Sequence, residues 1–261
     1  MNELESARQA YDMVILASEA RYWYFLIGSA LAGFVAIQGF AKLRGDQKEG
    51  ALRTAGLVLI VLNLVPTVYG LFSPAVELSL QRSLPFHFCA INGWLIAFNC
   101  FWKNTNVFTF SAFMGTIGGL YAVLTPQLTI GDAPAILAHY YFNHTAIVVM
   151  PIIMARTYGF RFPKWSWIWT YLAVAALSTA VGAFNWYLNT YHPGDITANY
   201  MYMWEAPKVK NPFLKGAPWP WYILPLHSAL ILHLVVINFA YRLGAPLEGM
   251  EGKAWWRRRL A

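Results

Sequence analysis

Long runs of residues without any formal charge limit what this chain can fold into. Hydrophobic residues make up 58% of the sequence and charged residues only 12%. Uncharged runs of about 17 to 25 residues are long enough to cross the hydrocarbon core of a bilayer. The sequence therefore predicts an all-α polytopic membrane protein, a seven-transmembrane helix bundle. Its expected spans are 22–41, 55–71, 85–102, 107–124, 135–154, 165–187 and 220–241.

Lys and Arg residues are distributed unevenly between the two sides of this bundle. With seven spans, six of them fall on the side of the N-terminus and thirteen on the opposite side. Cytoplasmic segments carry the excess of Lys and Arg, so we expect the N-terminus outside and the C-terminus in the cytoplasm. The net charge of +7 is then explained by membrane orientation, and we expect no nucleic-acid partner.

The chain is expected to form one membrane domain with short additions. Residues 22–241 make up the seven-helix domain, and residues 1–21 are predicted to form a short amphipathic helix on the outer surface. The connection 188–219 is rich in aromatic residues, which predicts a cap over the outer ends of the helices. The tail 242–261 is basic, which predicts contact with anionic lipid at the cytoplasmic surface.

The uncharged spans leave thiol, imidazole, amide and phenol groups as the means for any chemistry. Five of the six histidines lie in outer loops or in the outer half of a span. The third, fifth and seventh spans, which contain Cys89, His144 and His227, each enter the membrane from the outside, so these residues are expected at comparable depth. The sequence thus predicts a polar chamber near the outer ends of these helices. Imidazole groups inside a membrane span indicate a functional site.

Helical spacing indicates which polar residues can lie on the same side as the Cys89 thiol. Cys89 and Asn92 are three residues apart and share a helix face, whereas His87 is two residues from Cys89 and points nearly the opposite way. Any base for Cys89 should therefore come from span 135–154, where Tyr140 and His144 share a face. A thiol in an apolar helix is commonly a packing residue, and Cys100 is interpreted in that way.

Four short motifs occur in order along the chain. They are Leu84-Pro85-x-His87-x-Cys89, His144 in an aromatic-rich span, Asn199-Tyr200-Met201-Tyr202, and Pro218-Trp219-Pro220-Trp221-Tyr222. Together they resemble the YwaF family of bacterial integral membrane proteins. That family is distantly similar to a vertebrate membrane acyltransferase that remodels ether phospholipids with a Cys and a His as its proposed catalytic pair. The resemblance implies a bacterial cytoplasmic membrane, with Cys89 as the nucleophile and His144 as the base.

The leading functional hypothesis is a membrane lipid acyltransferase or thioesterase-like enzyme that needs no cofactor. Cys89 would accept an acyl group from a phospholipid and pass it to a lysophospholipid, with His144 carrying the proton. The groups expected to orient the base, bind the oxyanion or contact the substrate are Asn92, Tyr140, Asn143, Asn199, Tyr200 and His227.

Two other classes of function remain open from the sequence. A zinc-dependent intramembrane lipid hydrolase would use imidazole and thiol ligands. Its candidate ligands are Cys89, His87, His139, His144 and His227. A non-catalytic carrier of lipid or hydrophobic solute is the other alternative. A proton-coupled transporter is disfavoured, because the spans contain no Asp or Glu.

Overall fold

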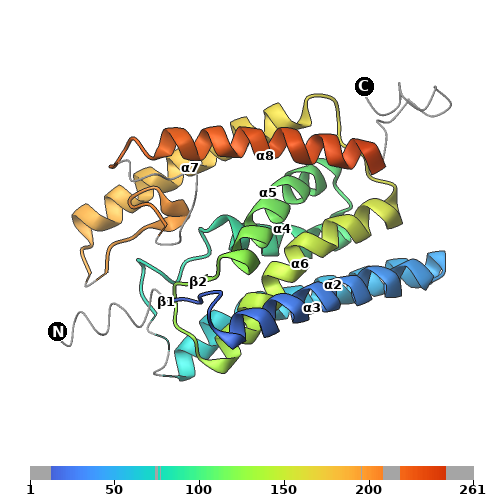
Figure 1. Ribbon diagram of the computed structural model, residues 1–261, viewed down its shortest axis with the longest axis horizontal. Coiled ribbons are helices and arrows are strands. Elements are labelled where there is room, and N and C mark those ends of the chain that lie inside the picture. The colour runs from blue at the N-terminus through green and yellow to red at the C-terminus, as the bar shows by residue number, and fades with distance from the viewer. Residues whose placement is uncertain (1–12, 74–75, 77, 195, 208–217, 245–261) are drawn as a thin grey trace.

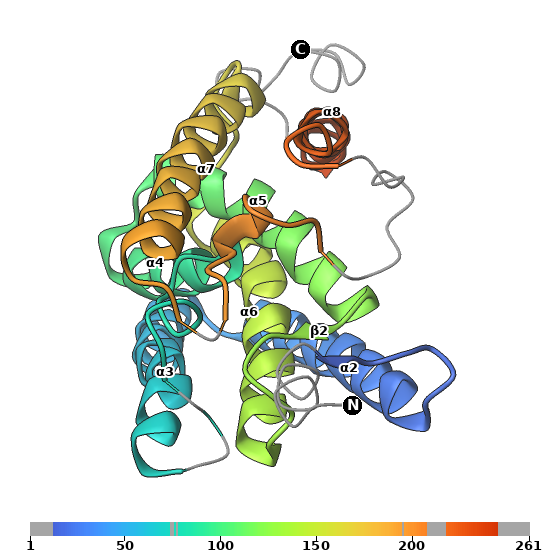
Figure 2. The ribbon, with the colours of Figure 1, turned by 90° about the vertical axis from the view of Figure 1, so that its left-hand side faces the viewer.

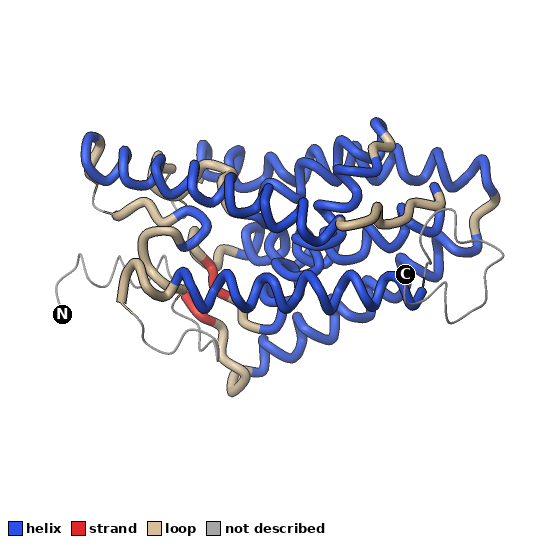
Figure 3. The backbone as a smooth tube through the Cα atoms, turned by 90° about the horizontal axis from the view of Figure 1, so that it is seen from above, coloured by secondary structure: helices blue, strands red, loops and turns tan. Residues whose placement is uncertain are grey.

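The computed structural model describes residues 13–73, 76, 78–194, 196–207 and 218–244. In this part of the chain, seven α-helices contain most of the residues (Figures 1 and 3). Six of them are long and apolar enough to cross a membrane, which confirms a multi-pass helical membrane protein. The helices are α2 (Ala20–Lys42), α3 (Gly45–Phe72), α4 (Phe88–Trp102), α5 (Thr105–Leu124), α6 (Pro134–Tyr158), α7 (Ser166–Tyr191) and α8 (Ile223–Gly244).

The helices form three layers, with α4, α5 and α6 in the middle. Helices α2 and α3 lie on one side of this central group, and α7 and α8 lie on the other (Figures 1 and 2). Helix α5 packs most extensively against α6, and α3 against α4. Few residues of α2, α3 and α8 are buried inside the protein. Their apolar side chains therefore face outward, as expected for helices in contact with lipid.

Helix α4 is the shortest of the seven described α-helices. It was expected over 85–102 as a full crossing, but it begins at Phe88 and has 15 residues. At a rise of 1.5 Å per residue its length is about 22 Å, short of the roughly 30 Å of a hydrocarbon core. His87 is its N-cap residue, and the residues before it form turns. Cys89 therefore lies in the first turn of a helix that starts late.

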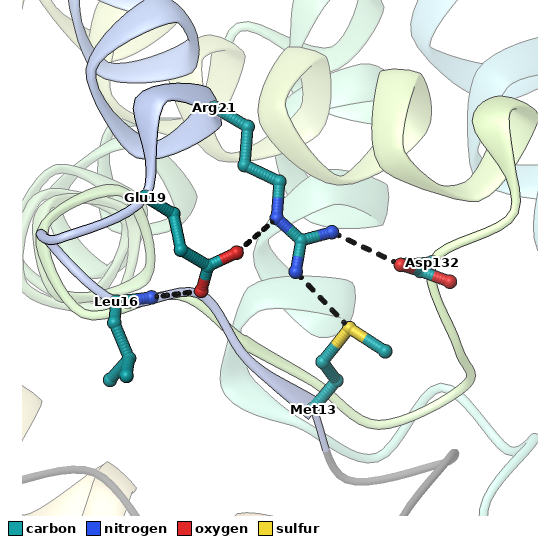
Figure 4. A network of polar contacts seen from close by, with 5 residues as sticks. All are labelled: Met13, Leu16, Glu19, Arg21 and Asp132. Atoms are coloured by element: carbon teal, nitrogen blue, oxygen red, sulfur yellow. Dashed lines mark hydrogen bonds and ion pairs between the residues drawn. The ribbon is translucent and has the colours of Figure 1, made fainter.

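The segment before α2 is tied to the loop between α5 and α6. Instead of the short helix predicted there, residues Met13–Val14 form strand β1, which pairs antiparallel with β2 (Gln127–Leu128). Arg21 donates hydrogen bonds to Glu19 and to Asp132, at 2.6 and 3.1 Å (Figure 4). Residues 1–12, and residues 245–261 of the predicted basic tail 242–261, lie outside the described residues.

The predicted cap is in part an extension of α7. This helix continues to Tyr191, and the connection then forms the 3-10 helix η1 (Tyr200–Tyr202). Met201 packs in a buried cluster with Val181 and Leu188 of α7, and residues of the first turn of α4 pack against this cluster. Residues 208–217 of the connection lie outside the described part. Its described residues are thus packed onto the helix ends, as a cap requires.

Two glycines let α5 and α6 approach closely. The sequence contains Gly115 and Gly119 at GxxxG spacing in α5, and a Cβ at Gly119 would meet Val148 at 2.5 Å and the carbonyl oxygen of His144 at 2.7 Å. A Cβ at Gly115 would contact the Ile147 carbonyl oxygen. Small residues at this spacing bring two membrane helices into backbone contact.

We expect Gly119→Ala to destabilise the bundle by about 1–3 kcal/mol, because the added methyl group has no space and forces α5 away from α6. Gly28→Ala is the matched control, since a Cβ at Gly28 meets nothing within 4 Å. Denaturation of both variants in the same detergent measures the difference. Equal stability of the two variants would contradict the close packing of α5 and α6.

A second prediction concerns the contacts of Glu19. Its hydrogen bond from the Leu16 amide, and then its bond with Arg21, lower the pKa of this carboxyl below its ordinary value of 4.5. The ionised Glu19 carboxylate therefore stabilises the folded protein at pH values above its ordinary pKa. This stabilisation is lost as the pH falls through the lowered pKa. Glu19→Gln should reduce the melting temperature at pH 7 and have no effect once the pH is below the lowered pKa.

The control for this prediction is Glu205→Gln. The Glu205 side chain is exposed and makes no ion pair with any described residue. A melting temperature that responds equally to both substitutions at pH 7 would show that the Glu19 contacts contribute nothing.

Candidate functional site

A single cavity of about 470 Å³ contains most of the residues predicted for the site. Its volume is in the range of about 300–1,000 Å³ typical of ligand pockets. Residues from all helices except α2 line it. Five predicted site residues are among them: Cys89, Tyr140, Asn143, His144 and His227.

Helix α5 brings Cys89 and His144 to the same level of the bundle. A Cβ at Gly118 would lie 3.1 Å from the sulfur of Cys89, and one at the adjacent Gly119 would lie 2.7 Å from the carbonyl oxygen of His144. The thiol and the histidine therefore flank consecutive residues of one helix. His144 is ten residues into α6, whereas Cys89 is the second residue of α4. The late start of α4 makes this possible.

The imidazole of His144 is held in one orientation. It is only 8% exposed, and its ring lies 4.2 Å from the ring of Tyr140. Its Nδ1 is 2.6 Å from the Tyr140 carbonyl oxygen, which can only accept a hydrogen bond. Nδ1 therefore carries the proton, and in the neutral ring Nε2 is the basic nitrogen. No group in the described part of the chain bonds to Nε2.

Side-chain amides gather one turn below the thiol. Gly93 follows Cys89 by four residues in α4, and a Cβ there would lie 2.6 Å from the Oδ1 of Asn63 and 2.9 Å from that of Asn143. Both amides line the cavity. The predicted Asn92 differs, because it does not line the cavity and its Nδ2 donates to the Phe88 carbonyl oxygen in its own helix.

Tyr200 and Asn199 support the site without lining it. The buried Tyr200 hydroxyl donates to the Leu80 carbonyl oxygen at 2.9 Å and accepts from the Leu84 amide at 3.0 Å. Burial raises the pKa of Tyr200 to about 12, so this hydroxyl keeps its proton. Asn199 accepts from the amides of Trp204 and Glu205. The two residues fix the loop before α4 and the turn after η1.

The other histidines occupy separate places around the cavity. His87 accepts from the Met201 amide at 3.4 Å, and its ring lies near those of Tyr200 and Tyr202. The Nε2 of His139 is buried without a described partner, and the Nδ1 of His227 lies 3.3 Å from the Tyr171 hydroxyl. Across the described ranges, no three His, Cys, Asp or Glu side chains are grouped so that they can hold a metal ion.

Asn63, Tyr121 and His233 were not predicted as site residues. Each is a polar residue inside an apolar span, and all three line the cavity. Their position in a span was a usable signal. Their meeting at one cavity depends on how the helices pack, which helical spacing within each span does not reveal.

Fold and cavity together define a multi-pass helical membrane protein with an internal cavity. A model of the TMEM164 family matches residues 16–238, and the chain belongs to this family. A search of curated proteins and a search of solved structures gave no match. The expected assignment to the YwaF family is therefore wrong. That expectation depended on four short motifs, whereas the TMEM164 match extends over most of the chain.

We expect a small uncharged thiol reagent to modify Cys89 well before Cys100. Cys89 is partly exposed and lines the cavity, while Cys100 is completely buried. Cys100→Ala and Cys89→Ala provide matched proteins with one thiol each, and intact mass after alkylation measures the two rates. Adding Gly118→Ala should slow the reaction of Cys89, because the new methyl group contacts its sulfur. Faster reaction of Cys100 would contradict the placement of Cys89 at the cavity.

Proposed function

We propose that the protein is a lipid acyltransferase in which Cys89 is the nucleophile and His144 the base. The observation that carries the proposal is the arrangement at one turn of α5, where the Cys89 sulfur lies beside Gly118 and the backbone of His144 lies beside Gly119, while both residues line one cavity. A thiol, a base, and a group that orients the base are the elements of nucleophilic acyl transfer. Here the Tyr140 carbonyl oxygen is the orienting group.

In the first step the Cys89 sulfur attacks the carbonyl carbon of an acyl ester, and its proton moves to the Nε2 of His144. The carbonyl oxygen becomes negative in the tetrahedral intermediate, and the amide of Asn143 is the nearby predicted donor for it. The C–O bond then breaks, and the alcohol leaves with the proton from Nε2. The products are a Cys89 thioester and a lysolipid.

In the second step a hydroxyl group attacks the thioester carbon. Nε2 takes the hydroxyl proton, the C–S bond breaks, and the proton returns to the sulfur. A second lysolipid as the acceptor gives transfer, and water gives a thioesterase-like hydrolysis. The protein ends each cycle with a neutral thiol and a neutral imidazole, as it began. No cofactor takes part.

Phospholipids are the proposed substrates. Among the described lining residues Arg82 is the only Lys, Arg, Asp or Glu, and a guanidinium matches the geometry of a phosphate. The rest of the lining is mainly apolar, which suits an acyl chain. From the distribution of its Lys and Arg residues, we place the N-terminus outside and the C-terminus in the cytoplasm.

Replacing Cys89 by Ala should reduce acyl transfer from labelled phospholipid to lysophospholipid in proteoliposomes to background. His144→Gln should reduce it by about 10²- to 10⁴-fold, because proton transfer by a positioned base contributes that much. Cys100→Ala and His192→Gln are the matched controls. Cys100 does not line the cavity, and His192 is exposed on the outer surface. Full activity in Cys89→Ala would exclude the mechanism.

A further inference from the structure

The cavity contains a second oriented histidine that the proposed mechanism does not use. The Nδ1 of His233 in α8 is 2.6 Å from the Ala229 carbonyl oxygen, so this nitrogen carries the proton. Its Nε2 lies 3.0 Å from the hydroxyl oxygen of Tyr121 in α5. With Nδ1 protonated in the neutral ring, Nε2 is an acceptor, and the Tyr121 hydroxyl donates to it. Both residues line the same cavity as Cys89.

This pair lies on a different side of α5 from the backbone of His144. Successive residues of an α-helix are about 100° apart. Relative to Gly118, which lies beside the Cys89 sulfur, Gly119 is rotated about 100° towards α6, and Tyr121 is rotated about 60° in the other direction. Tyr121 therefore faces α8 from the next turn of α5. Around α5, the position beside the thiol thus lies between the side that faces α6 and the side that faces α8.

The hydrogen bond to His233 determines what Tyr121 can bind. Its only proton is directed to Nε2, so the phenolic oxygen has only lone pairs left for a ligand. Such an oxygen binds a hydroxyl group, which donates, and does not bind an ester carbonyl, which only accepts. We propose that Tyr121 and His233 form a hydroxyl-binding site that holds the acyl acceptor beside the Cys89 thioester.

The proposed site explains how the cavity distinguishes the two lipids of an acyl transfer. A lysolipid has a free hydroxyl group, whereas a diacyl lipid has an ester at that position. A site built to bind a hydroxyl rejects an analogue that lacks it, because the site's own polar groups are then left unpaired. The name acyl acceptor rests on the proposed function, but binding of a hydroxyl group does not require turnover.

Equilibrium binding tests the site in the Cys89→Ala protein, which cannot form a thioester. The probes are radiolabelled 1-acyl lysophosphatidylcholine and the same lipid with hydrogen in place of the free hydroxyl. With Tyr121 present, the hydroxyl lipid should bind about fivefold to tenfold more tightly than the deoxy lipid. Adding Tyr121→Phe should bring this ratio close to one.

Tyr241→Phe is the matched control, because Tyr241 does not line the cavity and its hydroxyl has no described partner. It should leave the ratio unchanged. Equal binding of the deoxy lipid by the Tyr121→Phe protein and its parent shows that the cavity is intact. A ratio that stays the same in Tyr121→Phe, or that is near one in the parent protein, would overturn the proposal.

A second measurement separates this inference from the proposed function. In protein with Cys89 intact, Tyr121→Phe should still form the acyl-enzyme, seen by intact mass, and should show a KM for lysolipid raised by the same factor. Absence of any acyl-enzyme in the unmodified protein would refute the acyltransferase mechanism. The existence of the hydroxyl-binding site would then be decided by the binding measurement alone. A KM for lysolipid that Tyr121→Phe does not change would overturn the acceptor site alone.

Discussion

The hydrogen bonds of the Tyr200 hydroxyl are the contacts on which the arrangement of the site depends. Helix α4 begins late, so the turns before it must satisfy their backbone groups without the help of a helix. Tyr200 bonds to the backbone of Leu80 and of Leu84, while Asn185 in α7 holds the Tyr200 backbone in both directions. The cap, α7 and the start of α4 are thereby joined. This junction sets the depth of Cys89.

Three glycines of α5 then allow α6 and the Cys89 sulfur to lie close to α5 at this depth. Gly115 and Gly119 admit α6 at backbone distance, and the intervening Gly118 leaves space for the Cys89 sulfur. A side chain at any of the three would push a neighbouring helix or the thiol away. The ordinary interpretation of a GxxxG motif is close helix packing. Here the same packing also brings the backbone of His144 to Gly119, next to the glycine that lies beside the thiol, so that stability and proposed chemistry depend on the same three positions.

Much of the fold could be predicted from charge-free segments, because burial in lipid permits little besides helices of sufficient length. The helical membrane fold was confirmed, and Cys89 and His144 do line one cavity. Other features depend on tertiary contacts that are not evident in any single span. The late start of α4 follows from anchoring by Tyr200, a residue more than a hundred positions away. The meeting of Tyr121 with His233 depends on how α8 packs across α5.

A cavity with little formal charge can still distinguish its ligands by where its protons are held. His144 and His233 each have Nδ1 bonded to the carbonyl oxygen four residues earlier, which leaves Nε2 as the acceptor in both rings. The two histidines differ in the hydrogen-bond partner of Nε2. Nothing described bonds to Nε2 of His144, which suits a base, whereas Nε2 of His233 holds the proton of Tyr121. In the proposed function, the same kind of backbone hydrogen bond thus orients one imidazole that takes a proton and another that helps to recognise a hydroxyl.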